Sequence, residues 1–239
     1  MVGRSQSSRA RSPEAKRARE ATILDAATRL ATADGIRSVT LTDIAAEVGM
    51  HKSAMLRYFE TREEIFLRLA AAGWTEWSQA VREQLGGAAP GTDREDATDA
   101  DDGMDRGSHL RAVAGLLAES LVARPLFCDL LAHTPMNLER NVSLESVRSF
   151  KLTALAEVAA VGEALCRTAA LSPAQAGDVV ATATSMAGAL WQMAAPGTEL
   201  RRLYASDPDL AHALVDVAPR LTGILSALLR GYGAGGEVG

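Results

Sequence analysis

The sequence has few cysteines, few aromatic residues and no long hydrophobic run. Its two cysteines, Cys128 and Cys166, form neither a CxxC pair nor a recognisable zinc-binding set. Because no secretory signal precedes them, a reducing, cytoplasmic location is expected. No apolar run approaches the roughly 18 residues that a transmembrane helix requires, so we expect a soluble protein without a membrane segment.

Motifs that carry catalysis or bind cofactors are also missing. The sequence has no phosphate-binding glycine loop, GxSxG elbow or HExxH motif, and its four histidines are scattered. The acidic run DATDADDG lacks the spaced positions and the terminal glutamate of a calcium-binding loop. The sequence therefore predicts no enzyme, no resident metal and no cofactor.

Alanine and leucine dominate what is present. Hydrophobic residues make up 47% of the 239 residues and aromatic residues only 4%, a composition that favours helices around a real core. Apolar residues recur at helical spacing, and no alternating strand pattern or fixed repeat occurs. The sequence predicts an all-α protein of one large or two modest domains.

Charge is distributed unevenly along the chain. The net charge is −5, but residues 1–62 carry eleven Lys/Arg against seven Asp/Glu, which leaves +4 there and −9 in the remainder. A basic amino-terminal module on an acidic body suits a protein that binds DNA with one part and is regulated through another.

Residues 39–62, VTLTDIAAEVGMHKSAMLRYFETR, predict two short helices joined by a tight turn. Thr40 is a suitable N-cap, and Asp43 completes a capping box. Gly49 is expected to end this helix because glycine tolerates positive φ. A second helix is expected over about residues 51–59, so the stretch has the pattern of a helix-turn-helix.

The outward side chains of the second helix are cationic or hydroxyl-bearing. Lys52, Ser53, Arg57 and Tyr58 match a recognition helix, in which leading residues reach base edges and basic neighbours hold phosphates. The alternative is an ordinary helical hairpin with a solvated polar face.

Residues 40–66, TLTDIAAEVGMHKSAMLRYFETREEIF, resemble the DNA-binding domain of the tetracycline-repressor (TetR) family. The resemblance extends over roughly residues 18–68. It implies an N-terminal three-helix, homeodomain-like helix-turn-helix domain, followed by a larger helical domain that dimerises and often binds a small molecule. The sequence departs from the family at Leu56, where members usually have a tyrosine that touches the DNA backbone.

Seven residues are predicted to contact DNA. Lys52, Ser53, Arg57 and Tyr58 are expected to enter or flank the major groove, Thr40 and Arg62 to hold phosphates on either side, and His51 to touch DNA from the start of the recognition helix. A single short helix makes few contacts, so a homodimer reading a palindromic operator in double-stranded DNA is expected.

Composition divides the chain into segments. Residues 1–12 are predicted to be a disordered basic arm that either contacts DNA or solubilises the chain, and residues 13–62 the DNA-binding domain. Residues 63–233 are predicted to be the regulatory and dimerisation domain, with a flexible acidic loop at 86–107, and residues 234–239 a disordered tail. Helices of that domain are expected to start at Thr61, Ser108, Asn137, Ser172 and Asp207, with a short apolar helix from Leu126 to His133.

Small residues at 181–189 permit close helix approach. Together with the apolar last helix, they predict either a four-helix dimer seam or intrachain packing alone.

Large residues of the helical body are candidates for an effector pocket. They are Trp74, Trp77, Phe127, His133, Phe150 and Trp191. Each aromatic residue could equally be plain core. No basic cluster accompanies them, so a small, fairly apolar effector is expected and a strongly anionic one is disfavoured.

These observations favour a ligand-responsive transcriptional regulator, and they favour a repressor over an activator. The alternative is a helical ligand-binding or adaptor protein that does not bind DNA. Basic residues on the recognition face and on the arm argue against that alternative.

Overall fold

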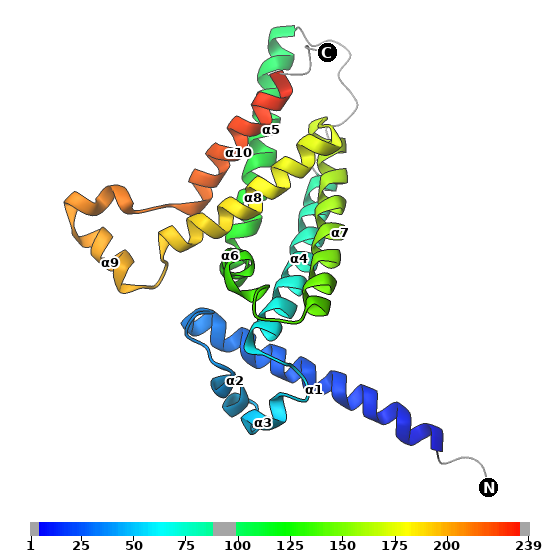
Figure 1. Cartoon of the computed structure of the whole chain (residues 1–239). Helices are drawn as coiled ribbons and strands as arrows, with labels where there is room; N and C mark the ends of the chain where they lie inside the picture. Colours follow the sequence, from blue (N-terminus) through cyan, green and yellow to red (C-terminus); the bar gives the residue numbers. More distant parts are fainter. Residues whose placement is uncertain (1–4, 88–98, 235–239) are drawn as a thin grey trace.

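The computed structural model describes residues 5–87 and 99–234, and this part of the chain contains helices and no strand (Figure 1). The helices are α1 (Ser5–Asp34), α2 (Leu41–Glu47), α3 (Lys52–Met55), α4 (Arg62–Gly87), α5 (Asp99–Val122), α6 (Pro125–His133), α7 (Leu144–Ala169), α8 (Pro173–Ala194), α9 (Glu199–Ser206) and α10 (Val217–Ala234). A π-helical turn, Thr134–Leu138, follows α6, and a 3₁₀ turn, Pro208–Ala213, follows α9. The predicted all-α class is confirmed.

Helices α1 to α3 form a small amino-terminal unit, and α4 leads from it into the larger body (Figure 1). In the body, α4 packs on α7, α5 on α10, and α8 on α6, α7 and α10. Ile23, Ile44, Met55 and Phe59 are almost completely buried and form the core of the small unit. Within residues 5–87 and 99–234, no helix has both the length and the apolar content that spanning a bilayer would require.

Local capping forms the first helix pair as predicted. The Thr40 hydroxyl accepts a hydrogen bond from Asp43 N, and the Asp43 carboxylate accepts one from Thr40 N, so the capping box is complete. Gly49 has a φ of +64°, a conformation that glycine adopts without strain. Both predictions are confirmed.

Helix α3 is shorter than expected. Its α-helical part is Lys52–Met55, and hydrogen bonds from Tyr58 N and Phe59 N to Met55 O carry a turn on to Phe59. The predicted cap of the next helix is confirmed, since Glu64 N donates to the Thr61 hydroxyl at 3.1 Å. Residues 52–59 therefore present a compact surface rather than two full helical turns.

Two segments predicted to be irregular are partly helical. The backbone of α1 already begins at Ser5 and continues through Pro13, where the helix was expected to start. Residues 1–4 of the predicted arm and residues 235–239 of the predicted tail lie outside the described residues. Of the predicted acidic loop, residues 88–98 also lie outside, whereas α4 extends to Gly87 and α5 begins at Asp99. Arginine and alanine at residues 9–11 favour the early start of α1, whereas the aspartates and glycines of residues 99–107 do not explain that of α5.

Two further predicted helix starts are wrong, because each was placed too early in the chain. Asn137 does not cap the long helix α7, because the π-helical turn prolongs α6 beyond Pro135 and Ser143 caps α7 instead. Pro135 cannot donate an amide hydrogen bond to the preceding turn, and the helix widens into the π-helical turn at this point. Likewise, Asp207 caps only the 3₁₀ turn, and α10 starts ten residues later at Val217.

The small residues of α8 allow close packing inside the chain. Ala183, Ala187 and Gly188 are buried, and α8 packs against α6 through this face. A Cβ atom at Gly188 would lie 2.8 Å from the backbone nitrogen of Ala132, so backbone rather than a flexible side chain stands in its way. The opposite face of α8 leaves Ala181 and Ala189 exposed.

Replacing Gly188 by alanine is therefore expected to lower the free energy of unfolding by about 1–3 kcal/mol, because α6 must move away from α8. Gly177→Ala is the matched control on the same helix, since nothing lies within 4 Å of a Cβ atom there. That control should be neutral or slightly stabilising because alanine favours helices. Urea denaturation of both variants measures the difference, and equal effects would contradict the close contact.

Candidate functional site

The outer surface of α3 carries the residues that were predicted to face outward. Lys52, Ser53 and Arg57 are exposed, and Tyr58 is half-buried. Leu56, where the sequence departs from the family pattern, is 52% exposed and lies among them. Two cations, a hydroxyl and an aliphatic side chain are thus displayed together, a combination that can contact phosphates, base edges and methyl groups.

His51 positions the start of this surface. It is exposed and acts as the N-cap of α3, with its Nδ1 accepting a hydrogen bond from Ser53 N at 3.4 Å. The same nitrogen lies 2.9 Å from the Ser53 hydroxyl. His51 therefore orders the first turn of α3 in addition to lying at its edge.

Thr40 and Arg62 are engaged within the small unit, which differs from their predicted phosphate contacts. The Thr40 hydroxyl donates to Asp43 at 2.7 Å. The Arg62 guanidinium donates to the carbonyl oxygens of Ile36 and Val39, and it lies 4.7 Å from the centre of the Phe66 ring. These two side chains hold the turn between α1 and α2 in place.

Three of the predicted ligand-binding residues pack against each other in the core. Trp74 contacts both Trp77 and Phe127 edge-to-face, with ring centroids 5.7 Å apart in each case. All three are buried. The Phe127 ring reaches α4 because Gly73 has no side chain: a Cβ atom there would lie 2.5 Å from the ring. This cluster is a packed core contact rather than the wall of an empty site.

The other predicted residues lie apart from this cluster. Phe150 lines a cavity of about 370 Å³ between α4 and the start of α7. Trp191 lines a different cavity of about 750 Å³. His133 is buried beside Asp129. The six predicted pocket residues therefore do not converge on one site.

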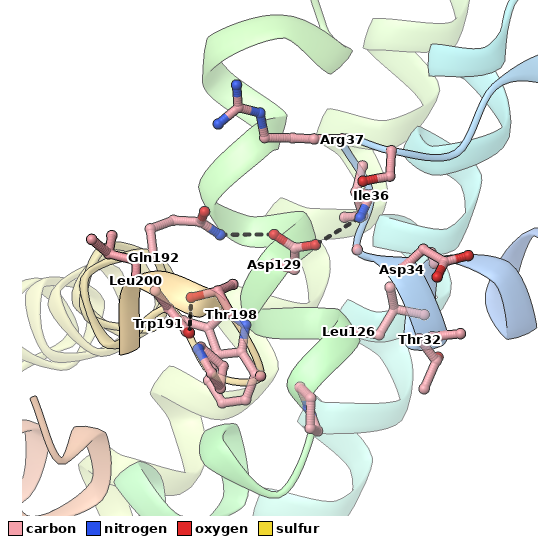
Figure 2. A pocket seen from close by; sticks show the side chains of 18 residues that line it. Thr32, Asp34, Ile36, Arg37, Leu126, Asp129, Trp191, Gln192, Thr198 and Leu200 are labelled. Carbon is pink, nitrogen blue, oxygen red and sulfur yellow. Dashed lines mark hydrogen bonds between the residues drawn. The ribbon is translucent and has the colours of Figure 1, made fainter. Parts of the chain in front are cut away.

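The larger cavity, which we call the boundary cavity, lies between the small unit and the body (Figure 2). Residues 31–38 of α1 and the following turn form one wall, and Pro125, Leu126 and Asp129 of α6 another. The remaining wall consists of the end of α8 and the residues up to Leu200.

Asp129 connects three elements next to this cavity (Figure 2). Its Oδ2 accepts a hydrogen bond from Ile36 N at 3.0 Å, and its Oδ1 accepts one from Gln192 Nε2 at 2.7 Å. On the side of α6, His133 Nδ1 lies 3.2 Å from Oδ1 and 2.9 Å from the Asp129 carbonyl oxygen. Among the side chains that the structure describes, Asp129 alone forms a hydrogen bond between the α1–α2 turn and α6.

The environment shifts both titratable groups in this network. Burial raises the pKa of Asp129, but hydrogen bonds from His133, Ile36 N and Gln192 outweigh it and leave the pKa below its usual value. The hydrogen bond to Asp129 raises the pKa of His133, against the opposing effects of burial and of Arg37. The geometry therefore favours the ion pair over the neutral forms.

This pair predicts a pH-dependent stability. Because the pKa of His133 is raised in the folded state, its stabilising effect is complete below the ordinary histidine pKa of about 6.5 and is lost as pH rises through the folded-state pKa. The Tm of the wild type should therefore exceed that of His133→Gln most at mildly acidic pH, and the gap should narrow at alkaline pH. Each 1 kcal/mol corresponds to about 2–4 °C in a protein of this size. His212→Gln on the exposed 3₁₀ turn controls for the loss of a histidine, and parallel curves for the wild type and His133→Gln would contradict the coupling.

The contact between Asp129 and Ile36 was not foreseen from the sequence. The two residues are 93 positions apart. The donor is the backbone amide of Ile36, and because every residue except proline has such an amide, the sequence does not indicate which one Asp129 will bind. One indication of a buried polar contact was present in the sequence, because Asp129 is the single acidic residue of the largely apolar segment PLFCDLLAH.

Comparisons with known proteins agree with this architecture. Residues 23–69 match the model of the family described as "Bacterial regulatory proteins, tetR family". Residues 72–236 match the model described as "Tetracyclin repressor-like, C-terminal domain". A search of curated proteins finds no match.

Solved structures with the same fold have low sequence identity. The fatty acid degradation regulator FadR from Bacillus halodurans aligns over 88% of this chain and 97% of its own, at 14% identity and a TM-score of 0.51. A TetR-family regulator from Mesorhizobium loti, described as putative, aligns over 92% and 96%, also at 14% identity and a TM-score of 0.51. At this identity, the two structures support the fold alone.

Proposed function

Because the chain belongs to the tetracycline-repressor (TetR) family of DNA-binding transcriptional regulators, we propose that it is a homodimeric repressor of a palindromic operator, released by a small-molecule effector. The observation that carries the proposal is the exposed surface of α3, where Lys52, Ser53 and Arg57 follow the turn at Gly49. The excess positive charge of residues 1–62 supports it, since phosphate neutralisation dominates affinity for DNA.

Each residue of this surface has a proposed role. Lys52 and Ser53 at the start of α3 reach base edges in the major groove, and Arg57 and Tyr58 hold phosphates. His51 flanks the groove. Leu56 supplies no hydroxyl for a phosphate, but its exposed aliphatic side chain suits the methyl group of a thymine. We assign Thr40 and Arg62 to the scaffold of the domain because their polar groups are bonded within it.

TetR-family regulators act as dimers, and we propose that α8 and α10 form the seam. Ala181 and Ala189 on α8 and Gly223 and Ala227 on α10 are exposed and small, and the two helices pack side by side. Two such pairs related by a two-fold axis would make a four-helix contact. The axis would place two α3 helices on successive half-sites of the operator.

Release requires that the effector bind the DNA-incompetent state more tightly, typically by about 1–3 kcal/mol. Helix α4 is the proposed mechanical link because it begins beside α3 and packs along α7 in the body. In this proposal the protein binds its operator in the cytoplasm and catalyses no reaction.

Selection of bound sequences from a random double-stranded DNA pool by the purified protein tests the proposal. The expected result is a palindromic motif whose half-sites are about one helical turn or more apart. Transcription in vitro from a promoter that carries the motif then tests repression. The competing function, a helical ligand-binding or adaptor protein, predicts no enriched sequence at all.

A further inference from the structure

We propose that the effector binds in the boundary cavity rather than in the aromatic core, and that it is an amphipathic cation whose N–H groups take Asp129 away from Ile36. The inference rests on the proposed regulatory function. It adds the place and the chemistry of the ligand. A cavity of about 750 Å³ lies within the usual size range of small-molecule sites, whereas Trp74, Trp77 and Phe127 fill the core with their own contacts.

Two carboxylates at the cavity favour a cation with N–H donors. Asp34 and Asp129 line it, and Arg37 is the single lysine or arginine among its described lining residues. The carboxyl ends of α1 and α8 also face it, because residues 31–38 and 195–198 belong to its wall. Helix carboxyl ends carry partial negative charge. Arg37, His133 beside Asp129 and the amino ends of α6 and α9 balance these charges. The cation is therefore favoured by the two carboxylates as hydrogen-bond acceptors, and not by the net charge of the wall.

Apolar side chains in the cavity suit a flat or aliphatic body on the same ligand. Trp191 is half-buried in the wall, and Leu126 and Leu200 lie across from one another on α6 and α9 (Figure 2). A tryptophan face attracts cations and stacks on planar groups. An aromatic ring with a forked cationic head would therefore place its ring on Trp191 and its N–H donors on the Asp129 carboxylate.

Competition for Asp129 would transmit the signal to the small unit. The Oδ2 atom that accepts from Ile36 N is the atom that a ligand's N–H groups would engage. Ile36 lies in the turn whose carbonyl oxygens hold Arg62, and this turn ends at Thr40, the cap of α2. A ligand on Asp129 thus frees the turn that orients α2 and α3. The neighbouring Gln192 and His133 keep the carboxylate in place while its partner changes.

The test uses benzamidine as the probe, with benzamide and benzoate as its neutral and anionic counterparts. Calorimetric titration of the full-length protein should show benzamidine binding at least ten-fold more tightly than either counterpart. Asp129→Asn should weaken benzamidine binding at least ten-fold, and Trp191→Leu should also weaken it. Asp25→Asn, which removes an exposed carboxylate of α1 outside the cavity, should leave binding unchanged.

Amide hydrogen exchange gives a second readout that needs no DNA. Benzamidine should speed exchange at Ile36 N while amides in the α4–α7 core keep their rates. Equal affinity for benzamidine and benzamide, or unchanged binding in Asp129→Asn, would overturn the site. If benzamidine binds and frees Ile36 but no operator is found, the proposed function fails and the site stands. If an operator is found and benzamidine neither binds nor weakens its complex, the site fails alone.

Discussion

Trp77→Ala is expected to lower the free energy of unfolding by about 3–5 kcal/mol, the usual cost of removing a buried tryptophan or phenylalanine. Trp77 is fully buried, and its ring lies against Trp74 and Phe127. Its Nε1–H donates to the Ser120 hydroxyl at 3.0 Å, so truncation also leaves that group without its donor. The sequence alone made Trp77 a ligand-binding candidate, for which truncation would change the ligand response only.

Trp191→Ala provides the comparison within the same protein. Trp191 is only half-buried and lines the boundary cavity, so its truncation should cost clearly less stability than that of Trp77. Urea denaturation followed by circular dichroism measures both. If Trp77→Ala kept wild-type stability and lost only its response to an effector, the assignment of the aromatic cluster to the core would be wrong.

The double variant Lys52→Glu/Arg57→Glu is expected to bind the selected operator roughly 100-fold more weakly or worse, since each base or phosphate contact contributes about 1–3 kcal/mol. Both side chains are exposed, and neither supports the core. The thermal midpoint should therefore stay within a few degrees of the wild type. The slope of log affinity against log salt should also become shallower, because fewer phosphates are neutralised.

A charge-matched control separates local contacts from net charge. Arg111→Glu/Arg167→Glu makes the same change in charge at two exposed positions of the body, in the middle of α5 and near the end of α7, away from α3 (Figure 1). Its operator affinity should fall only slightly, because screening weakens charges beyond about 10 Å at 0.1 M salt. Fluorescence anisotropy with labelled operator measures all three proteins. Equal losses in the two double variants would mean that α3 is not the recognition helix.

Features that depend on residues within one helical turn could be predicted from the sequence. The Thr40–Asp43 capping box and the Thr61 cap were predicted because donor and acceptor are three residues apart in each. The turn at Gly49 was predicted because glycine adopts a positive φ without strain. The same reasoning failed where several caps competed. Asn137 and Asp207 both have capping side chains, but packing and proline placement moved the long helices to Leu144 and Val217.

Exposure of the recognition surface followed from the same local pattern. Residues at helical spacing either turn toward Met55 and Phe59 in the core or away from them, so Lys52 and Arg57 had to face outward. The phosphate contact of Arg62 remains a prediction, and local spacing gave no indication of the hydrogen bonds that this side chain makes within the domain. Its guanidinium found acceptors 23 and 26 residues earlier in the chain, at Val39 and Ile36.

The sequence by itself determined the helical class, the helix-turn-helix and the basic charge of its outer face, because helix propensity, capping and periodicity act between near neighbours. Only the tertiary structure decided which large residues became core and which line a cavity, since burial depends on what packs opposite each side chain. It also brought Asp129 to the amide of Ile36, 93 residues away. A backbone group has no identity in a sequence, and its partner is set by how α6 meets the turn after α1.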